Sequence, residues 1–232
     1  MWLVLAHASD RTARELTERW PHGCRLVTPA DVCAEDWAPE IDDAAAGPSG
    51  AALPGAVRGV ITRLGGIGSA DLVGVHVTDC GYAAAELAAF LLAWLDDCPV
   101  PVISRPEPGS LNGPAWSAAQ WTLAAHRAGL AVLPLRLGSS PESAGDSPGA
   151  GADGVPSDGV TVTVIGDRVI GDVHPRLSQG AARLARAAGT RLLGVTFDGR
   201  EVGSRFAGAS VCPALPPRAA EALADQLGWT TC

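Results

Sequence analysis

The sequence predicts an α/β fold, with an N-terminal open, mostly parallel sheet and a small C-terminal α+β unit that has antiparallel strands. Up to residue 138, short apolar segments alternate with amphipathic helical segments, which is typical of a parallel sheet covered by helices. After residue 158, a strictly alternating segment meets a Gly166-Asp167 turn, which is typical of an antiparallel hairpin. Residues 139–158 between the two units are rich in Ser, Gly, Pro and acidic residues, and this composition predicts a flexible linker.

The expected strands of the first unit are short apolar runs bounded by polar residues, Gly or Pro. They cover residues 2–6, 24–28, 58–64, 100–104 and 130–135. The first helix follows a cap at Ser9 or Asp10 and runs to about residue 20. Residues 31–55, rich in Ala, Pro, Gly and acids, predict a loop with at most one short element.

Two further helices are expected before the linker. Asp79 is a good N-cap for the first of them, which carries a wide apolar face and ends before Pro99. The second begins at Gly113-Pro114, because a proline in the first turn loses no hydrogen bond, and it ends at Gly129.

The second unit, residues 159–232, predicts a hairpin of residues 160–165 and 168–170, a helix over 177–188, a strand over 192–197 and a final helix over 217–227. A unit of about seventy residues buries too little surface to be very stable by itself. We therefore expect it to dock on the first unit.

The charge and composition exclude several classes of protein. The net charge is −8 and there is no basic tail or stripe, so a nucleic-acid partner is not expected. All 17 cationic residues are arginine, for which coding bias in a GC-rich genome is the simplest explanation. Without lysine the chain has no Schiff-base residue, no P-loop lysine and no lysine base.

The remaining composition predicts a cytoplasmic protein without a metal site. The six cysteines form neither a CxxC pair nor a Cys/His cluster, and the N-terminus lacks the basic segment of a signal peptide. The most apolar run, residues 82–95, is too short to cross a bilayer and contains Glu86. We expect free thiols, no cofactor and no membrane contact.

Ligands of open α/β sheets bind beyond the carboxyl ends of the strands. His7, Arg63 and Arg105 follow three predicted strands there, and two guanidinium groups in one crevice suit a carboxylate or phosphate. Asn112 and Tyr82 are further candidate ligand-binding residues. The alternatives are that each arginine pairs with a nearby carboxylate, that His7 is structural, and that Tyr82 marks the wetter edge of its helix.

The remaining motifs do not identify a catalytic or nucleotide-binding site. The segment 65–68 (Gly-Gly-Ile-Gly) follows a strand and offers backbone amides to an anion, but it lacks the third glycine of the dinucleotide fingerprint. No GxSxG, HExxH, P-loop or paired-carboxylate motif is present, so the catalytic residues are not identified. Cys212 is either a nucleophile or, since no histidine is near it in sequence, a buried thiol.

The order of these segments resembles the ATP-grasp proteins, and more narrowly the RimK-like, glutathione-synthetase-type ligases found beside peptide-modifying and natural-product genes. Residues 101–106 (PVISRP), 111–114 (LNGP) and 126–130 (HRAGL) are similar to the N-terminal domain of that family, with Ser104 in place of its Asn. Residues 183–189 (RLARAAG) and 193–197 (LGVTF) are similar to its last lobe.

The departures from the family are as informative as the matches. The resemblance implies a middle lobe with phosphate-binding lysines, and here residues 139–158 stand in its place. It also implies magnesium ligands where Thr196, Ser210 and Cys212 occur. Since phosphoryl transfer depends on positioned cations and Mg²⁺, ATP-dependent ligation is not expected.

The resemblance therefore implies a degenerate, truncated relative that acts as a non-catalytic accessory protein. We expect a ligase or tailoring enzyme as its partner, or self-association, in peptide or natural-product modification; several of the seven tryptophans are candidates for the interface. Two alternatives stay open: a small enzyme that uses the arginine-lined crevice, and a metabolite-binding α/β domain.

Overall fold

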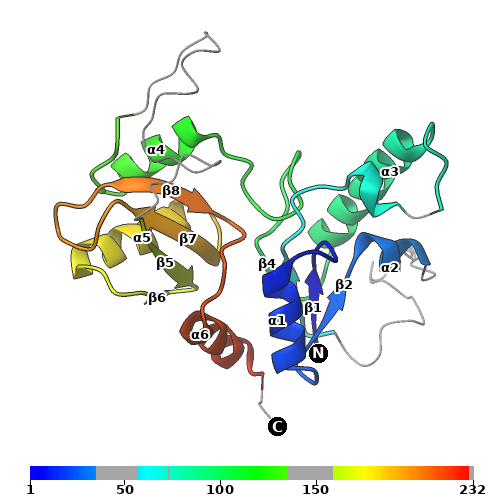
Figure 1. The fold of residues 1–232 in the computed structure, drawn as a ribbon, viewed down its shortest axis with the longest axis horizontal. Coiled ribbons are helices and arrows are strands. Elements are labelled where there is room, and N and C mark those ends of the chain that lie inside the picture. The colour runs from blue at the N-terminus through cyan, green and yellow to red at the C-terminus, as the bar shows by residue number, and fades with distance from the viewer. Residues whose placement is uncertain (35–56, 73, 135–158, 230–232) are drawn as a thin grey trace. The chain divides into compact units, whose positions relative to one another are not determined.

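The computed structural model describes residues 1–34, 57–72, 74–134 and 159–229. The chain forms two compact units (Figure 1). Unit 1 contains Met1–Ala115 together with Ala220–Cys232, and unit 2 contains Trp116–Ala219. Within the described residues no helix is long and apolar enough to span a membrane.

Unit 1 is built on a four-stranded parallel sheet with the order β2-β1-β3-β4. Its strands are β1 (Trp2–Leu5), β2 (Cys24–Val27), β3 (Gly59–Thr62) and β4 (Val102–Ile103). In the register of the sheet, Trp2 lies beside Cys24 and Gly59. Every residue of β1 and β3 is buried, as continuous apolar runs in the centre of a parallel sheet should be.

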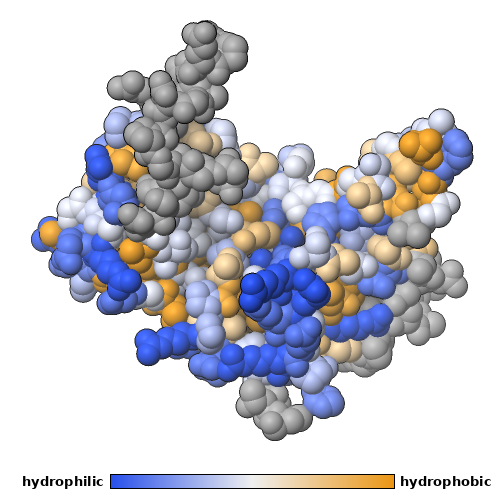
Figure 2. Space-filling view, in the orientation of Figure 1, coloured by the Kyte–Doolittle hydropathy of each residue, from blue (hydrophilic) through white to orange (hydrophobic). Residues whose placement is uncertain are grey.

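Helices pack on this sheet. They are α1 (Arg11–Arg19), α2 (Pro29–Ala34), the 3₁₀ turn η1 (Ser69–Asp71) and α3 (Cys80–Asp96). The second half of α3 inserts Leu91 and Leu95 into the sheet's apolar core, whereas its first turns pack near η1 through Cys80 and Ala84. Figure 2 shows hydrophobic surface near the start of α3, where Val77 is 80% exposed, and hydrophilic surface over α1.

Unit 2 is built on a four-stranded antiparallel sheet with the order β6-β5-β7-β8. Its elements are α4 (Ala118–Arg127), β5 (Val160–Ile165), β6 (Arg168–Ile170), α5 (Pro175–Ala187), β7 (Leu192–Phe197) and β8 (Phe206–Ser210). Trp121 of α4 and Leu184 of α5 share one core with Val164 and Phe197 of the sheet. Both helices thus complete the same hydrophobic core (Figure 1).

The last helix, α6 (Pro217–Leu227), returns the chain to unit 1 from residue 220 onward. Arg19 of α1 forms an ion pair with Glu221 at 2.5 Å. The Trp20 and Trp229 rings contact each other with centroids 5.7 Å apart, and the Trp2 indole donates to the Leu227 carbonyl at 3.2 Å. These contacts join the end of the chain to the amino end of the first sheet.

The structure confirms the predicted fold class, a parallel sheet followed by a separate antiparallel one. It divides the chain differently from the expected boundaries at residues 138 and 159. Helix α4 belongs to unit 2, and residues 220–229 belong to unit 1. The predicted linker, residues 139–158, lies outside the described residues.

Two predicted elements are wrong. Residues 130–134 form no strand of the parallel sheet; instead Val132 makes one isolated bridge to Phe206 in unit 2. The helix expected from Gly113 begins at Ala118, because Ser117 caps it: its hydroxyl accepts from the Gln120 amide and the Gln120 side chain accepts from the Ser117 amide. This reciprocal capping box outweighs the preference of Pro114 for a first turn.

Candidate functional site

The candidate site lies at the carboxyl edge of the parallel sheet, where β1, β3 and β4 end. His7 and Asp10 follow β1, Arg63 follows β3, and Ser104 follows β4. Parallel strands present their carboxyl ends at one edge of the sheet, so these residues are brought together from distant parts of the sequence. All of them belong to unit 1.

Arg63 is held in place by an ion pair with Asp10. The Arg63 Nε donates to the Asp10 Oδ2 at 2.9 Å, and the Arg63 side chain is only 4% exposed. The other Asp10 oxygen, Oδ1, accepts from the Ala13 amide and caps α1. One carboxylate therefore fixes both the start of a helix and a buried guanidinium group, and a pair so enclosed depends strongly on both partners.

His7 is oriented by Asp71. The His7 Nδ1 and the Asp71 Oδ1 are 2.8 Å apart, and the Asp71 Oδ2 accepts from the Gly68 amide at 2.8 Å. Because an ionised carboxylate only accepts hydrogen bonds, the His7 Nδ1 carries the proton in this pair. In the neutral ring, Nε2 then carries the lone pair and is the basic atom. The same Asp71 holds the glycine-rich segment 65–68.

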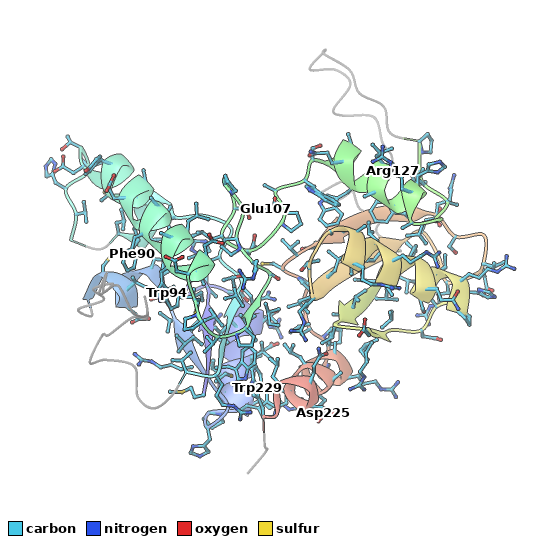
Figure 3. The ribbon with its side chains drawn as sticks, turned by 180° about the vertical axis from the view of Figure 1, so that it is seen from behind. Phe90, Trp94, Glu107, Arg127, Asp225 and Trp229 are labelled. Carbon is cyan, nitrogen blue, oxygen red and sulfur yellow. The ribbon has the colours of Figure 1, made fainter. Side chains whose placement is uncertain are left out.

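The turn after β4 brings Asn112 to the same edge. Ser104 is buried and has a left-handed backbone with a φ of 61°, and its carbonyl accepts from the Thr62 hydroxyl at 2.6 Å. Glu107 and Ser110 then exchange two backbone hydrogen bonds of 2.9 Å, in the loop that Figure 3 marks with Glu107.

After this turn the chain runs back along the end of β3. The Leu111 amide donates to the Gly65 carbonyl at 3.2 Å. Asn112 is buried, and its Oδ1 accepts from the Ser110 hydroxyl at 2.7 Å. A Cβ placed on Gly65 would lie 3.8 Å from the Asn112 amide, so this amide lies directly against the segment that follows β3.

Of the five candidate residues, His7, Arg63, Arg105 and Asn112 lie at this edge of the sheet. Tyr82 is 72% exposed and points away from the core of unit 1. Arg105 is exposed. Arg63 does pair with a carboxylate, as the alternative for the arginines states. The partner is Asp10, which the sequence predicts only as a helix cap.

Asp10, Asp71 and Ser104 are the site residues that sequence reasoning assigned to other roles or passed over. Asp71 pairs with His7 and not with an arginine. The signal for Ser104 was its place directly after a strand and before Arg105-Pro106, where a sharp turn needs an unusual backbone angle.

The magnesium ligands that the resemblance implies would lie on and just after β7 and β8 of unit 2. Thr196 lies in register with Gly208 on β8, and Gly194 lies in register with Ser210. The Thr161 and Thr196 hydroxyls lie 2.9 Å apart and form a hydrogen bond, and neither hydroxyl carries a charge. In the described part of the chain no three His, Cys, Asp or Glu side chains group together as a metal site. Mg²⁺ prefers carboxylate ligands, so this set of residues does not fit it.

Two buried cysteines of unit 1, Cys24 and Cys98, are poor nucleophiles. Burial raises the pKa of the Cys24 thiol to about 12. Burial also raises the pKa of Cys98, against smaller opposing effects of a backbone hydrogen bond at Val100 and the charge of Arg105. Because the thiolate is the reactive form, neither residue is poised for catalysis near neutral pH. Cys212, in unit 2, is partly buried.

The two sheets and their helices define an ATP-grasp-like fold. The chain is similar to the macrocyclase MdnB from Microcystis aeruginosa MRC, with a TM-score of 0.68, 13% identity and 99% of each chain covered. It is also similar to the macrocyclase MdnC from the same organism, bound with precursor peptide MdnA, with a TM-score of 0.66, 10% identity, and 98% of this chain and 99% of MdnC covered.

A third similar structure is the ATP-grasp ligase PsnB complexed with minimal precursor, Mg and ADP. Its TM-score is 0.64, with 17% identity and 98% of each chain covered. No protein-family model matches the sequence, and no curated protein matches it significantly. At these identities the likeness establishes the fold, and function has to be argued from the residues.

Proposed function

We propose that this protein is a non-catalytic, ATP-grasp-like accessory protein that partners a ligase or another tailoring enzyme in peptide or natural-product modification. The observation that carries this proposal is an ATP-grasp-like fold in which the expected magnesium positions are hydroxyl or thiol side chains and the whole sequence contains no lysine. The fold is kept while the groups for phosphoryl transfer are missing.

The physical argument concerns charge. Phosphoryl transfer stabilises negative charge on the transferred group with metal ions and positioned cations. Thr196 and Ser210 offer hydroxyl groups and Cys212 offers a thiol, whereas Mg²⁺ prefers carboxylate oxygens. We infer that the chain is a truncated relative in which residues 139–158 replace the central ATP-binding lobe.

The role in peptide modification rests on the similar structures. MdnC is bound with a precursor peptide and PsnB is complexed with a minimal precursor. A scaffold that keeps this fold without the ATP chemistry is suited to binding the peptide or the enzyme that modifies it. We expect the partner to be a protein or peptide rather than a nucleic acid, since the net charge is −8.

Thermal unfolding tests the loss of ATP chemistry. A ligand at a hundred times its dissociation constant stabilises a fold by about 2.7 kcal/mol, which shifts the melting temperature measurably. We expect no shift with ATP and Mg²⁺, and we expect the purified protein to co-purify with its partner enzyme when both are produced together. Stabilisation by Mg-ATP, or substrate turnover by the isolated monomer, would contradict the proposal.

One observation favours a second function, an enzyme or metabolite-binding protein that takes a carboxylate or phosphate ligand at the carboxyl edge. His7 is oriented by Asp71 as a base, and Arg63 lies at the same edge of the sheet. A screen of small carboxylates and phosphate by thermal unfolding distinguishes the two functions. Stabilisation by one of these ligands that is lost in His7→Gln supports the second function, and no stabilisation favours the first.

A further inference from the structure

A basic surface lies on the solvent side of α4 and α5 in unit 2. In residues 116–134 and 159–219, the described part of this unit, nine residues are arginine and four are acidic. Two of the acidic residues, Asp172 and Asp198, already pair with arginines of the loop between β7 and β8. Neither α4 nor α5 contains an Asp or Glu. Unit 2 is therefore locally basic, although the net charge of the whole chain is −8.

The basic surface is centred where the end of α4 meets α5. The Arg183 Nε donates to the Ala128 carbonyl at 2.8 Å, across a sequence separation of 55 residues. Arg127, which Figure 3 labels, is the last residue of α4 and directly precedes Ala128. Arg186 follows Arg183 by three residues, so these two side chains are neighbours on α5. Three exposed guanidinium groups and the exposed His126 thus come from adjoining parts of two helices.

The ends of the two helices account for only part of this positive charge. Cations are favoured in the last turn of a helix because its unsatisfied carbonyls carry about half a negative charge. His126 and Arg127 lie in the last turn of α4, and Arg186 lies in that of α5. Two helix ends therefore offset about one of the three guanidinium charges. Among the described residues, Arg127, Arg183 and Arg186 take part in none of the observed ion pairs.

An apolar side chain lies beside the basic surface. Leu123 of α4 is 48% exposed and precedes Arg127 by four residues, so both lie on one face of the helix. Trp121 and Ala125 of the same helix are buried in the core of unit 2. A ligand on this face therefore meets several guanidinium groups and one leucine side chain.

We propose that this surface binds a short acidic peptide segment of a partner protein, in which Asp or Glu residues flank an apolar residue. Arginine offers paired N–H donors that match the two oxygens of a carboxylate. The apolar residue of the segment packs on Leu123. The proposal does not depend on the proposed function, because the surface includes neither the carboxyl edge of unit 1 nor the expected magnesium positions on β7 and β8.

The charge and the apolar area favour a peptide over other anionic partners. Salt screens charges beyond about 8 Å, so a short segment responds to the local arginines. A long nucleic acid also meets the field of a chain whose net charge is −8. A helix that lies on a membrane buries a broad apolar face in the lipid, whereas the apolar residues Trp121 and Ala125 of α4 face the core.

The test measures the fluorescence anisotropy of a labelled peptide made of repeated Glu-Glu-Leu-Gly units, titrated with the full-length protein at physiological ionic strength. One control peptide has Gln in place of every Glu, and a second has Ser in place of every Leu. We expect saturable binding of the acidic peptide, no binding of the Gln peptide and weaker binding of the Ser peptide.

The variant Arg127→Gln/Arg186→Gln removes two guanidinium groups and keeps Arg183, whose Nε bonds to the end of α4. The matched control is Arg168→Gln/Arg176→Gln, which removes the same charge from other exposed positions of unit 2. All four substituted side chains are exposed, so we expect both double variants to fold. The first should weaken binding of the acidic peptide about fivefold or more, and the second should change it less than about twofold.

Leu123→Ser tests the apolar contact. It should weaken binding of the acidic peptide and leave binding of the Ser peptide unchanged. The proposal is overturned if the acidic peptide does not bind, if the Gln peptide binds equally well, or if both double variants weaken binding equally. Displacement of the peptide by single-stranded RNA or by anionic lipid vesicles at the same concentration of charge would also overturn it, because the surface would then accept any polyanion.

Discussion

Asp10 shows how one side chain links a helix cap to the candidate site. It accepts from the Ala13 amide at 2.9 Å and pairs with the buried Arg63. Asp10→Asn keeps an oxygen for the cap and removes the charge, so it should lower the free energy of unfolding by about 3 kcal/mol, because the buried Arg63 loses the ion pair with Asp10.

Asp10→Ala removes the cap as well and should cost about 1 kcal/mol more. Urea denaturation of both variants measures the difference. Equal losses in Asn and Ala would mean that the cap contributes nothing, and a loss below about 1 kcal/mol in Asp10→Asn would contradict the dependence of Arg63 on this ion pair.

The Cys24 thiol predicts how stability changes at alkaline pH. Its pKa is raised to about 12 in the fold from an ordinary value of 9.0, because burial disfavours the thiolate. A raised pKa means that the contribution to stability is complete below pH 9 and is lost as the pH rises toward 12. Cys24→Ala should therefore show a shallower decline above pH 9, by up to about 1.4 kcal/mol per pH unit. Urea titrations between pH 8 and 10.5 measure both slopes, and parallel slopes would refute the assignment.

At position 104 we expect a glycine variant to be more stable than an alanine variant, the reverse of the usual order. Glycine at an ordinary position lowers stability, but at a φ of 61° every L side chain is strained. Ser104→Gly and Ser104→Ala both remove the hydroxyl, so their difference isolates the backbone. We expect Ser104→Gly to be more stable than Ser104→Ala by about 0.5–1 kcal/mol, the left-handed strain less the greater entropy of unfolded glycine. A more stable Ser104→Ala in thermal unfolding would argue against a strained turn.

At the scale of elements, α6 depends on the glycine that follows it. Gly228 has a φ of +68° and its amide donates to the Asp225 carbonyl. Gly228→Ala should cost about 1 kcal/mol, since alanine is strained in this conformation. Gln226→Ala, on an exposed position of the same helix, is the control and should be nearly neutral. Thermal unfolding of the two variants compares them directly.

Elements whose signals are local could be predicted from the sequence. The hairpin of β5 and β6 follows from its alternating pattern and its two-residue turn, and α6 follows from Pro217. The segment around Val132 was predicted as a strand because it is short and apolar. Val132 bridges to Phe206 instead. A local apolar pattern does not identify the distant segment with which a residue pairs.

The candidate site, like the fold, could be predicted from the sequence only in part. The places of His7 and Arg63 after their strands follow from the rule for parallel sheets. Their partners do not, because Asp10 and Asp71 reach them only through the turns that bring α1 and η1 back over the edge. Tyr82 is 72% exposed, which agrees with the alternative that it marks the wetter edge of its helix.

At the scale of the whole molecule, the units do not follow the order of the chain. Unit 1 takes residues 220–229 from the far end of the sequence, and unit 2 takes α4 from before the predicted linker. The ATP-grasp-like fold thus depends on contacts between segments that are distant in the sequence.

This division predicts that a destabilising substitution in residues 220–229 also destabilises the N-terminal parallel sheet. Trp229→Ala removes a buried ring that contacts Trp20, and large-to-small changes of this kind cost about 3–5 kcal/mol. Leu184→Ala, in the core of unit 2, is the matched change on the other side. Hydrogen exchange should show lost protection of β1 and β3 amides in Trp229→Ala and of β5 and β7 amides in Leu184→Ala. If each variant loosened both sheets equally, the two units would unfold as one cooperative body and residues 220–229 would not belong to unit 1 alone.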